Sequence, residues 1–131
     1  MAATATTTLS LVLFLSLLSA STISETQAQA ESIVHVTSKL PGNTDAMHIH
    51  CTSKDLVVIY RELRAGQSCS WTAEEKTPSY CTAGWTGKMA TWPAFEPSRD
   101  AGHGKVLWLV KEDGFYLSRD GSRWVKEAVW N

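Results

Sequence analysis

The chain has 131 residues and an almost neutral charge, with 12 Lys and Arg residues against 13 Asp and Glu residues. Because it contains no run of like charges, neither nucleic acid nor an anionic membrane is expected as its main partner. A chain of this length predicts one small folded domain.

The first 30 residues have the pattern of a secretory signal peptide. The apolar run LSLVLFLSLLSA, from Leu9 to Ala20, is too short to span a bilayer and has the length of a signal-peptide core. The residues before it lack the Lys or Arg that such peptides usually carry. Small residues allow cleavage after Ala20 or after Ala30. We predict a secreted, extracellular protein with a mature domain at 31–131 and no membrane insertion.

The first half of this domain alternates short apolar runs with turn residues, and no helical period is visible. In the segment MHIHC, Met47, Ile49 and Cys51 share one face of an extended chain, whereas His48 and His50 share the other. Such alternation, with many β-branched residues, is typical of strands. The pattern predicts strands over residues 32–38, 47–51, 56–63, 68–73 and 80–85.

The last third of the chain has two Asp-Gly pairs, Asp113-Gly114 and Asp120-Gly121, between three β-prone runs. These pairs suit hairpin turns because Gly accepts a positive φ without a Cβ clash. We therefore expect a meander of two hairpins. The segment 93–105 before it is rich in Pro and Gly and is expected to form a long exposed loop. The whole pattern predicts an all-β fold, a small antiparallel β-sandwich of about seven to eight strands in a single domain.

The histidines do not predict a metal site. His48 and His50 point to the same side of a strand, but zinc needs a third and usually a fourth ligand, and the sequence does not place His35 or His103 nearby. Catalytic signatures are also missing, since the chain has no G-x-S-x-G elbow, no HExxH motif and no phosphate-binding glycine loop. We expect no metal, no cofactor and no enzymatic activity.

Three cysteines in a secreted domain allow one disulfide and leave one thiol over. The spacing alone permits Cys51–Cys69, Cys51–Cys81 or Cys69–Cys81. A covalent bridge would help a domain of about a hundred residues, because so small a core buries a limited share of the unfolded surface.

Six tryptophans are many for this length. Trp71, Trp85 and Trp108 lie in alternating strand patterns, so we expect them in the core of the sandwich. The alternative is that exposed tryptophans form a stacking platform for sugars, as in a small carbohydrate-binding or defence module.

Four short motifs follow one another in the mature part: HCTSKD at 50–55, GQSCSW at 66–71, Cys81 followed by Trp85, and WLVKEDGFYL at 108–117. Their order behind a signal peptide resembles the plant self-incompatibility protein S1 family, the S-protein homologues, which are small secreted β-sandwich proteins. The positions that carry the resemblance include His50, Ser53, Lys54, Asp55, Trp85, Trp108, Asp113 and Gly114.

The resemblance implies that Cys51 pairs with Cys81 and that Cys69 is a free, buried thiol. The chain departs from the family pattern in one respect that matters here. It lacks the second cysteine pair expected before Trp108. The loop 93–105 is therefore expected to be more mobile than in relatives.

The resemblance further implies a secreted, non-enzymatic protein ligand for cell-to-cell recognition or signalling, acting as a monomer on a cell-surface receptor protein. Loops would carry recognition, because a rigid sandwich presents them while its core only packs. The candidate loops are 39–46, 74–79, 93–105 and 118–123. The candidate residues within the last two are Glu96, Arg99, Asp100, His103, Arg119 and Asp120.

Overall fold

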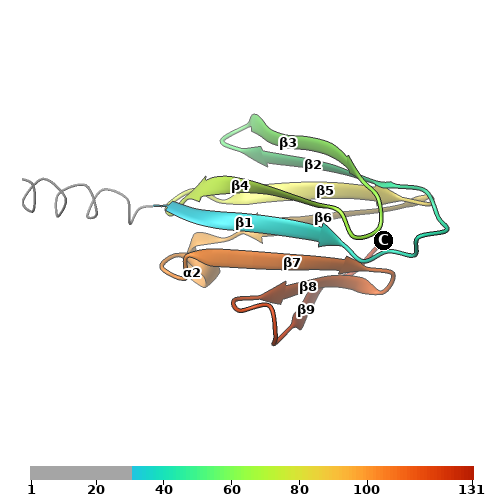
Figure 1. The fold of residues 1–131 in the computed structure, drawn as a ribbon. Coiled ribbons are helices and arrows are strands. Elements are labelled where there is room, and N and C mark those ends of the chain that lie inside the picture. Colours follow the sequence, from blue (N-terminus) through green and yellow to red (C-terminus); the bar gives the residue numbers. More distant parts are fainter. Residues whose placement is uncertain (1–30) are drawn as a thin grey trace, which may run out of the picture. The chain divides into compact units, whose positions relative to one another are not determined.

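Residues 31–131, the part of the chain that the computed structural model describes, form two β-sheets packed face to face (Figure 1). The predicted signal peptide lies outside the described residues. One sheet has the order β4-β1-β7-β8-β9, with β1 (Glu31–Ser38), β4 (Ser68–Glu74), β7 (Lys105–Lys111), β8 (Gly114–Ser118) and β9 (Val125–Ala128). The other has the order β3-β2-β5-β6, with β2 (Met47–Ser53), β3 (Leu56–Leu63), β5 (Ser79–Trp85) and β6 (Lys88–Phe95). The predicted all-β sandwich is confirmed.

The pairing of β1 with β7 is parallel, and the other strand pairs in residues 31–131 are antiparallel. The predicted antiparallel sandwich therefore contains one parallel pair, which the sequence did not predict. Parallel neighbours need a long connection, and here the chain builds the whole four-stranded sheet between β1 and β7. As a result β1 lies inside its sheet, between β4 and β7.

The end of strand β6 and the short helix α2 (Pro97–Asp100) lie in the segment 93–105, for which the sequence predicted a loop. Pro93 lies inside β6 and is paired with Tyr80. The strand tolerates a proline because β6 is an edge strand of its sheet, where a missing N–H costs little. The two predicted C-terminal hairpins are present, since β7, β8 and β9 are antiparallel neighbours.

The core lies between the inner faces of the sheets. Met47, Ile49 and Cys51 are buried there while His48 and His50 are exposed, as the alternation predicts. Trp85 and Trp108 are also core residues, as expected. Trp71 packs against the core but is only partly buried, so it is less buried than predicted.

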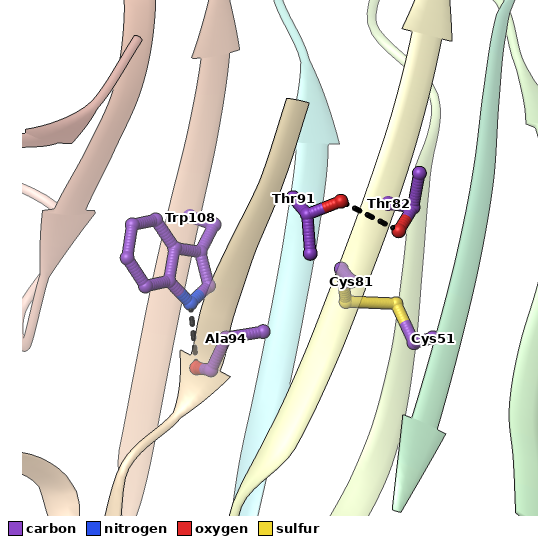
Figure 2. Close-up of a disulfide and its surroundings, with 6 residues drawn as sticks. All are labelled: Cys51, Cys81, Thr82, Thr91, Ala94 and Trp108. Atoms are coloured by element: carbon purple, nitrogen blue, oxygen red, sulfur yellow. Dashed lines mark hydrogen bonds between the residues drawn. A yellow bond between two sulfur atoms is a disulfide. The ribbon is translucent and has the colours of Figure 1, made fainter. Parts of the chain in front are cut away.

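The aromatic centre of the core is Trp92, which the sequence did not single out. Trp92 comes from β6 and packs edge-on against Trp108 of β7, with ring centres 5.9 Å apart, and against Phe115 of β8 at 4.3 Å. Trp108 also donates a hydrogen bond of 2.8 Å from Nε1 to the carbonyl of Ala94 (Figure 2). These contacts join the two sheets, because Trp92 and Ala94 belong to one and Trp108 to the other.

A disulfide joins Cys51 and Cys81, as the family resemblance implies (Figure 2). The two residues face each other directly on the neighbouring strands β2 and β5. The bridge therefore reinforces one sheet and does not join the two sheets. Cys69 on β4 is buried and unbridged.

Candidate recognition site

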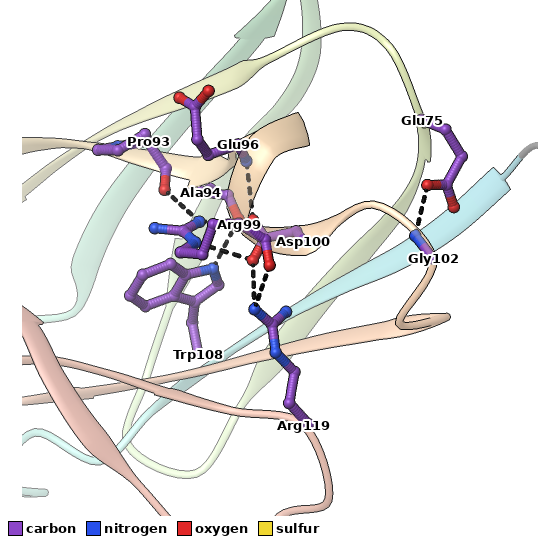
Figure 3. Close-up of polar contacts among 9 residues, drawn as sticks. All are labelled: Glu75, Pro93, Ala94, Glu96, Arg99, Asp100, Gly102, Trp108 and Arg119. Carbon is purple, nitrogen blue, oxygen red and sulfur yellow. Dashed lines mark hydrogen bonds and ion pairs between the residues drawn. The ribbon is translucent and has the colours of Figure 1, made fainter.

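Three of the predicted loops meet at one end of the sandwich, which we call the α2 end (Figure 3). It consists of residues 75–78 between β4 and β5, residues 96–104 around α2, and residues 119–124 between β8 and β9. Arg119 reaches across from the last loop, and its Nη2 lies 2.8 Å from Oδ1 of Asp100. The structure thereby brings together candidate residues that are about 20 positions apart in the sequence.

Asp100 is the centre of this contact and is fully buried. Its carboxylate accepts hydrogen bonds from the Glu96 backbone N–H at 2.7 Å, from Arg99 Nε at 2.8 Å and from Arg99 Nη2 at 2.6 Å. With the ion pair to Arg119, both carboxylate oxygens are satisfied. A buried charge is tolerated only with such partners.

The pKa of Asp100 follows from the same contacts. Burial raises the pKa of this carboxyl group, but hydrogen bonds from Arg99 and the Glu96 N–H, the Arg99 charge and the hydrogen bond from Arg119 outweigh it. The net effect lowers the pKa below the usual value of an aspartate. Asp100 is therefore held in its charged form.

Arg99 is fixed from three sides. Its guanidinium binds Asp100, donates a hydrogen bond of 2.9 Å to the carbonyl of Pro93, and lies 5.2 Å from the centre of the Trp108 ring (Figure 3). The segment was predicted to be solvent-exposed because of its prolines, glycines and charges. That prediction is wrong for Asp100, which is buried, and for Arg99, which is partly buried, because their charges pair with each other and with Arg119 instead of facing water. The segment's greater mobility than in relatives, expected from the missing second cysteine pair, stays a prediction.

Glu75 ties two further segments to the α2 end. Its carboxylate accepts hydrogen bonds from Ser32 Oγ at 2.6 Å and from the Gly102 N–H at 2.8 Å. The neighbouring Glu74 pairs with Lys54 at 2.8 Å and so connects the β2–β3 turn to the same end. Three loops and the start of β1 are thus held in fixed relative positions.

The loop 119–124 is ordered by Asp120. Its Oδ1 accepts hydrogen bonds from the backbone N–H groups of Ser122 and Arg123, at 2.9 and 3.1 Å, and from Ser118 Oγ at 3.1 Å. These bonds lower the pKa of Asp120 strongly, and the largest contributions come from the N–H groups of Ser122 and Arg123. Asp120 therefore has a structural role in its own loop and is not free to contact a partner through Oδ1.

The side chains that remain available at the α2 end differ from those the sequence proposed. Of the six candidates, His103 is exposed and Glu96 is partly exposed. Arg99 and Arg119 bind the buried Asp100, and Asp120, although exposed, orders its own loop. Arg123 and Lys105 lie in the predicted loops 118–123 and 93–105 but were not singled out as candidate residues, and both are exposed. A hollow of about 390 Å³ lies beside Arg123 and is also bordered by Arg99, Arg119, Asp120 and Glu127 among others. Lys105 borders a separate hollow of about 290 Å³, together with Arg119 and Asp120. The sequence signal for Arg123 was its place in the predicted loop 118–123.

The other positions singled out from the sequence lie elsewhere. The loop 39–46 is at the opposite end of the sandwich, with the β5–β6 turn (Figure 1). Trp85 and Trp108 are core residues, while Lys54 and Asp55 form the β2–β3 turn, both with positive φ. The remaining motif positions are His50, exposed on β2, Ser53, partly buried at the end of β2, Asp113, in the β7–β8 turn, and Gly114, buried at the start of β8.

The tryptophan platform proposed for sugar binding is not present. All six tryptophans lie within residues 31–131, and each is either buried or partly buried. Within the same residues, no group of three His, Cys, Asp or Glu side chains is arranged to hold a metal ion. In the described part of the chain, no helix has the length and apolar character needed to cross a membrane.

Residues 31–131 thus form a two-sheet all-β domain with one disulfide and a set of ordered loops at one end. Residues 33–130 match the family described as plant self-incompatibility protein S1, and the chain belongs to this family. No curated protein sequence matches the chain. It is similar to a solved structure described as a self-incompatibility protein homologue, from a family of small, highly stable, secreted plant proteins. The identity is 15%, the TM-score is 0.61, and the match covers 77% of this chain and 95% of the other, which supports the shared fold.

Proposed function

We propose that residues 1–30 direct secretion and that the mature domain is a non-enzymatic recognition ligand, which binds a cell-surface receptor protein as a monomer through its α2 end. Membership of the S1 family and the fold shared with a secreted plant protein support the extracellular part of this proposal. The ordered loops of the α2 end support the proposal that this end is the binding surface.

The observation that carries the proposal is the buried Asp100 network. It fixes the loops 96–104 and 119–124 against each other through Arg99 and Arg119. A surface that is already ordered loses little conformational entropy when a partner binds, and this favours affinity. The exposed residues beside the network, Arg123 and His103, are able to contact a partner without breaking it.

The electrostatic character of the α2 end indicates the kind of receptor surface that it fits. Arg123 is exposed, and the hollow beside it is bordered by three arginines, Arg99, Arg119 and Arg123, against two carboxylates, Asp120 and Glu127. Arginine is enriched in protein interfaces, where its guanidinium makes several directed hydrogen bonds. We infer that the receptor presents carboxylates to Arg123.

The test is binding of labelled protein, purified from the medium of plant cells that express the full chain, to intact plant cells. We expect secretion of the chain and saturable binding that is lost when the cells are treated with a protease. Retention inside the expressing cells would contradict the secretion proposal. Secretion with binding that never saturates, or that survives protease treatment, would contradict a receptor protein.

A further inference from the structure

The outer face of the four-stranded sheet has a second site candidate, centred on Gly84 of β5. Gly84 points outward, because its neighbours Ala83 and Trp85 are buried. Its φ is not in the left-handed region, and a Cβ atom at this position would meet no atom within 4 Å. Neither backbone conformation nor crowding therefore requires a glycine here. A glycine inside a strand weakens it and often marks a place where another molecule approaches closely.

The residues around Gly84 form a groove across the sheet. His48 of β2 and Met89 of β6 are its direct neighbours on either side, and Glu62 of β3 pairs with His48. A hollow of about 180 Å³ over Gly84 continues into a larger one of about 630 Å³ that reaches Asp45 at the end of the sheet. The larger volume is within the range of small-molecule sites, about 300–1,000 Å³. We call this feature the Gly84 groove.

The charges of the groove are nearly balanced. Two carboxylates, Asp45 and Glu62, and three cations, Arg61, Arg64 and Lys88, border the two hollows. A lining of this kind does not select a polyanion or a polycation. It offers hydrogen-bond acceptors and donors side by side, which suits a ligand rich in hydroxyl groups because a hydroxyl both donates and accepts.

One wall of the groove is aromatic. Tyr60 is 81% exposed, and its ring packs edge-on against His50 at 5.9 Å between centres. Thr82 and Thr91 continue the same row across the sheet and share a hydrogen bond of 2.9 Å. An exposed ring next to hydroxyl and carboxylate groups provides an apolar surface for the C–H face of a sugar and polar groups for its edge.

We propose that the Gly84 groove binds a neutral oligosaccharide. A peptide added as an extra strand does not fit, because such binding needs a free strand edge and the groove crosses β2 and β5, which are paired on both sides. The site is at the opposite end from Arg123, and it uses tyrosine and histidine side chains instead of tryptophan. It is independent of the proposed receptor contact.

The test is calorimetric titration of the protein produced from the full chain with neutral β-linked hexaoses of glucose, xylose and N-acetylglucosamine, and with acidic oligogalacturonate. We expect at least one neutral hexaose to bind and oligogalacturonate to bind more weakly. Gly84→Leu fills open space without backbone strain, so it should fold normally and lower the affinity at least tenfold. Tyr60→Ala should lower it by a similar factor.

Ser70→Leu is the matched control, because it adds the same side chain to an exposed strand position of the other sheet. It should leave the affinity unchanged, and so should Arg123→Glu. Absence of binding to every neutral hexaose at millimolar concentration would overturn the proposal. Undiminished binding by a folded Gly84→Leu protein, or preference for oligogalacturonate, would also overturn it.

Discussion

Replacing Asp100 with Asn should destabilise the domain strongly, although the change removes one charge and almost no volume. Removing one member of a buried ion pair costs about 3–5 kcal/mol, because it leaves the partner charge without compensation. Here the side chains left behind, Arg99 and Arg119, are 22% and 32% exposed and regain some hydration. We therefore expect the lower end of that range, a loss of about 3 kcal/mol in the free energy of unfolding.

For a domain of about a hundred residues, this loss corresponds to a fall in Tm of about 12–24 °C. Urea unfolding followed by tryptophan fluorescence gives the free energy directly. Asp113→Asn is the matched control, since Asp113 is exposed and pairs with Lys126 at the surface. It should change the stability little, because surface ion pairs contribute little.

The Asp100 contribution should also depend on pH. Its pKa is lowered in the folded state, so the stabilisation is complete above the unfolded pKa of about 3.9 and is lost as the pH falls through the folded value. The stability difference between the wild type and Asp100→Asn should therefore narrow below about pH 4. A difference smaller than about 1 kcal/mol at pH 7, or one that grows in acid, would refute this account of the network.

Three further predictions concern the core and the turns. Replacing both Cys51 and Cys81 with Ala should lower the free energy of unfolding by about 3–4 kcal/mol, since the bridge closes a span of 30 residues. Chemical denaturation measures this loss, and a loss below about 1 kcal/mol would contradict the prediction. Cys69 should resist alkylation at pH 8 in the native protein and react in denaturant, because burial raises the pKa of its thiol despite the nearby Arg61 charge; rapid native labelling would show that it is accessible. Gly114→Ala should lower the free energy of unfolding by about 1–3 kcal/mol, because the φ of Gly114 is +151° and a Cβ would lie 2.5 Å from the Ala128 carbonyl oxygen. Gly84→Ala should be neutral or slightly stabilising. Equal effects of the two substitutions on thermal unfolding would refute this.

The sequence predicted the parts of the fold that depend on local pattern. Met47, Ile49 and Cys51 alternate with exposed histidines, and this alternation alone assigns the buried face of β2. The Asp-Gly pairs predicted the C-terminal hairpins for a local reason as well, because Gly accepts the positive φ that a hairpin turn needs. The disulfide partner of Cys51 came from the family resemblance, because the spacing left three pairings open.

Features that depend on distant partners could not be predicted in this way. The apolar run at the start of β3 suggests burial, yet Leu56 and Val57 are exposed because β3 is an edge strand of its sheet. β6 was missed because Pro93 argues against a strand unless the strand is known to lie at an edge. Asp100 was assigned to an exposed loop because nothing local reveals that Arg119 covers it.

The most direct test of the proposed receptor contact compares two charge reversals at opposite ends of the sandwich. Arg123 is exposed at the α2 end, and Lys39 is exposed at the other end. Binding of the labelled, secreted protein to intact plant cells gives the apparent Kd for each variant, after thermal unfolding has shown that both are folded. The account predicts that Arg123→Glu weakens saturable binding at least tenfold and that Lys39→Glu leaves it unchanged. Equal affinities for the two variants, or a loss confined to Lys39→Glu, would contradict it.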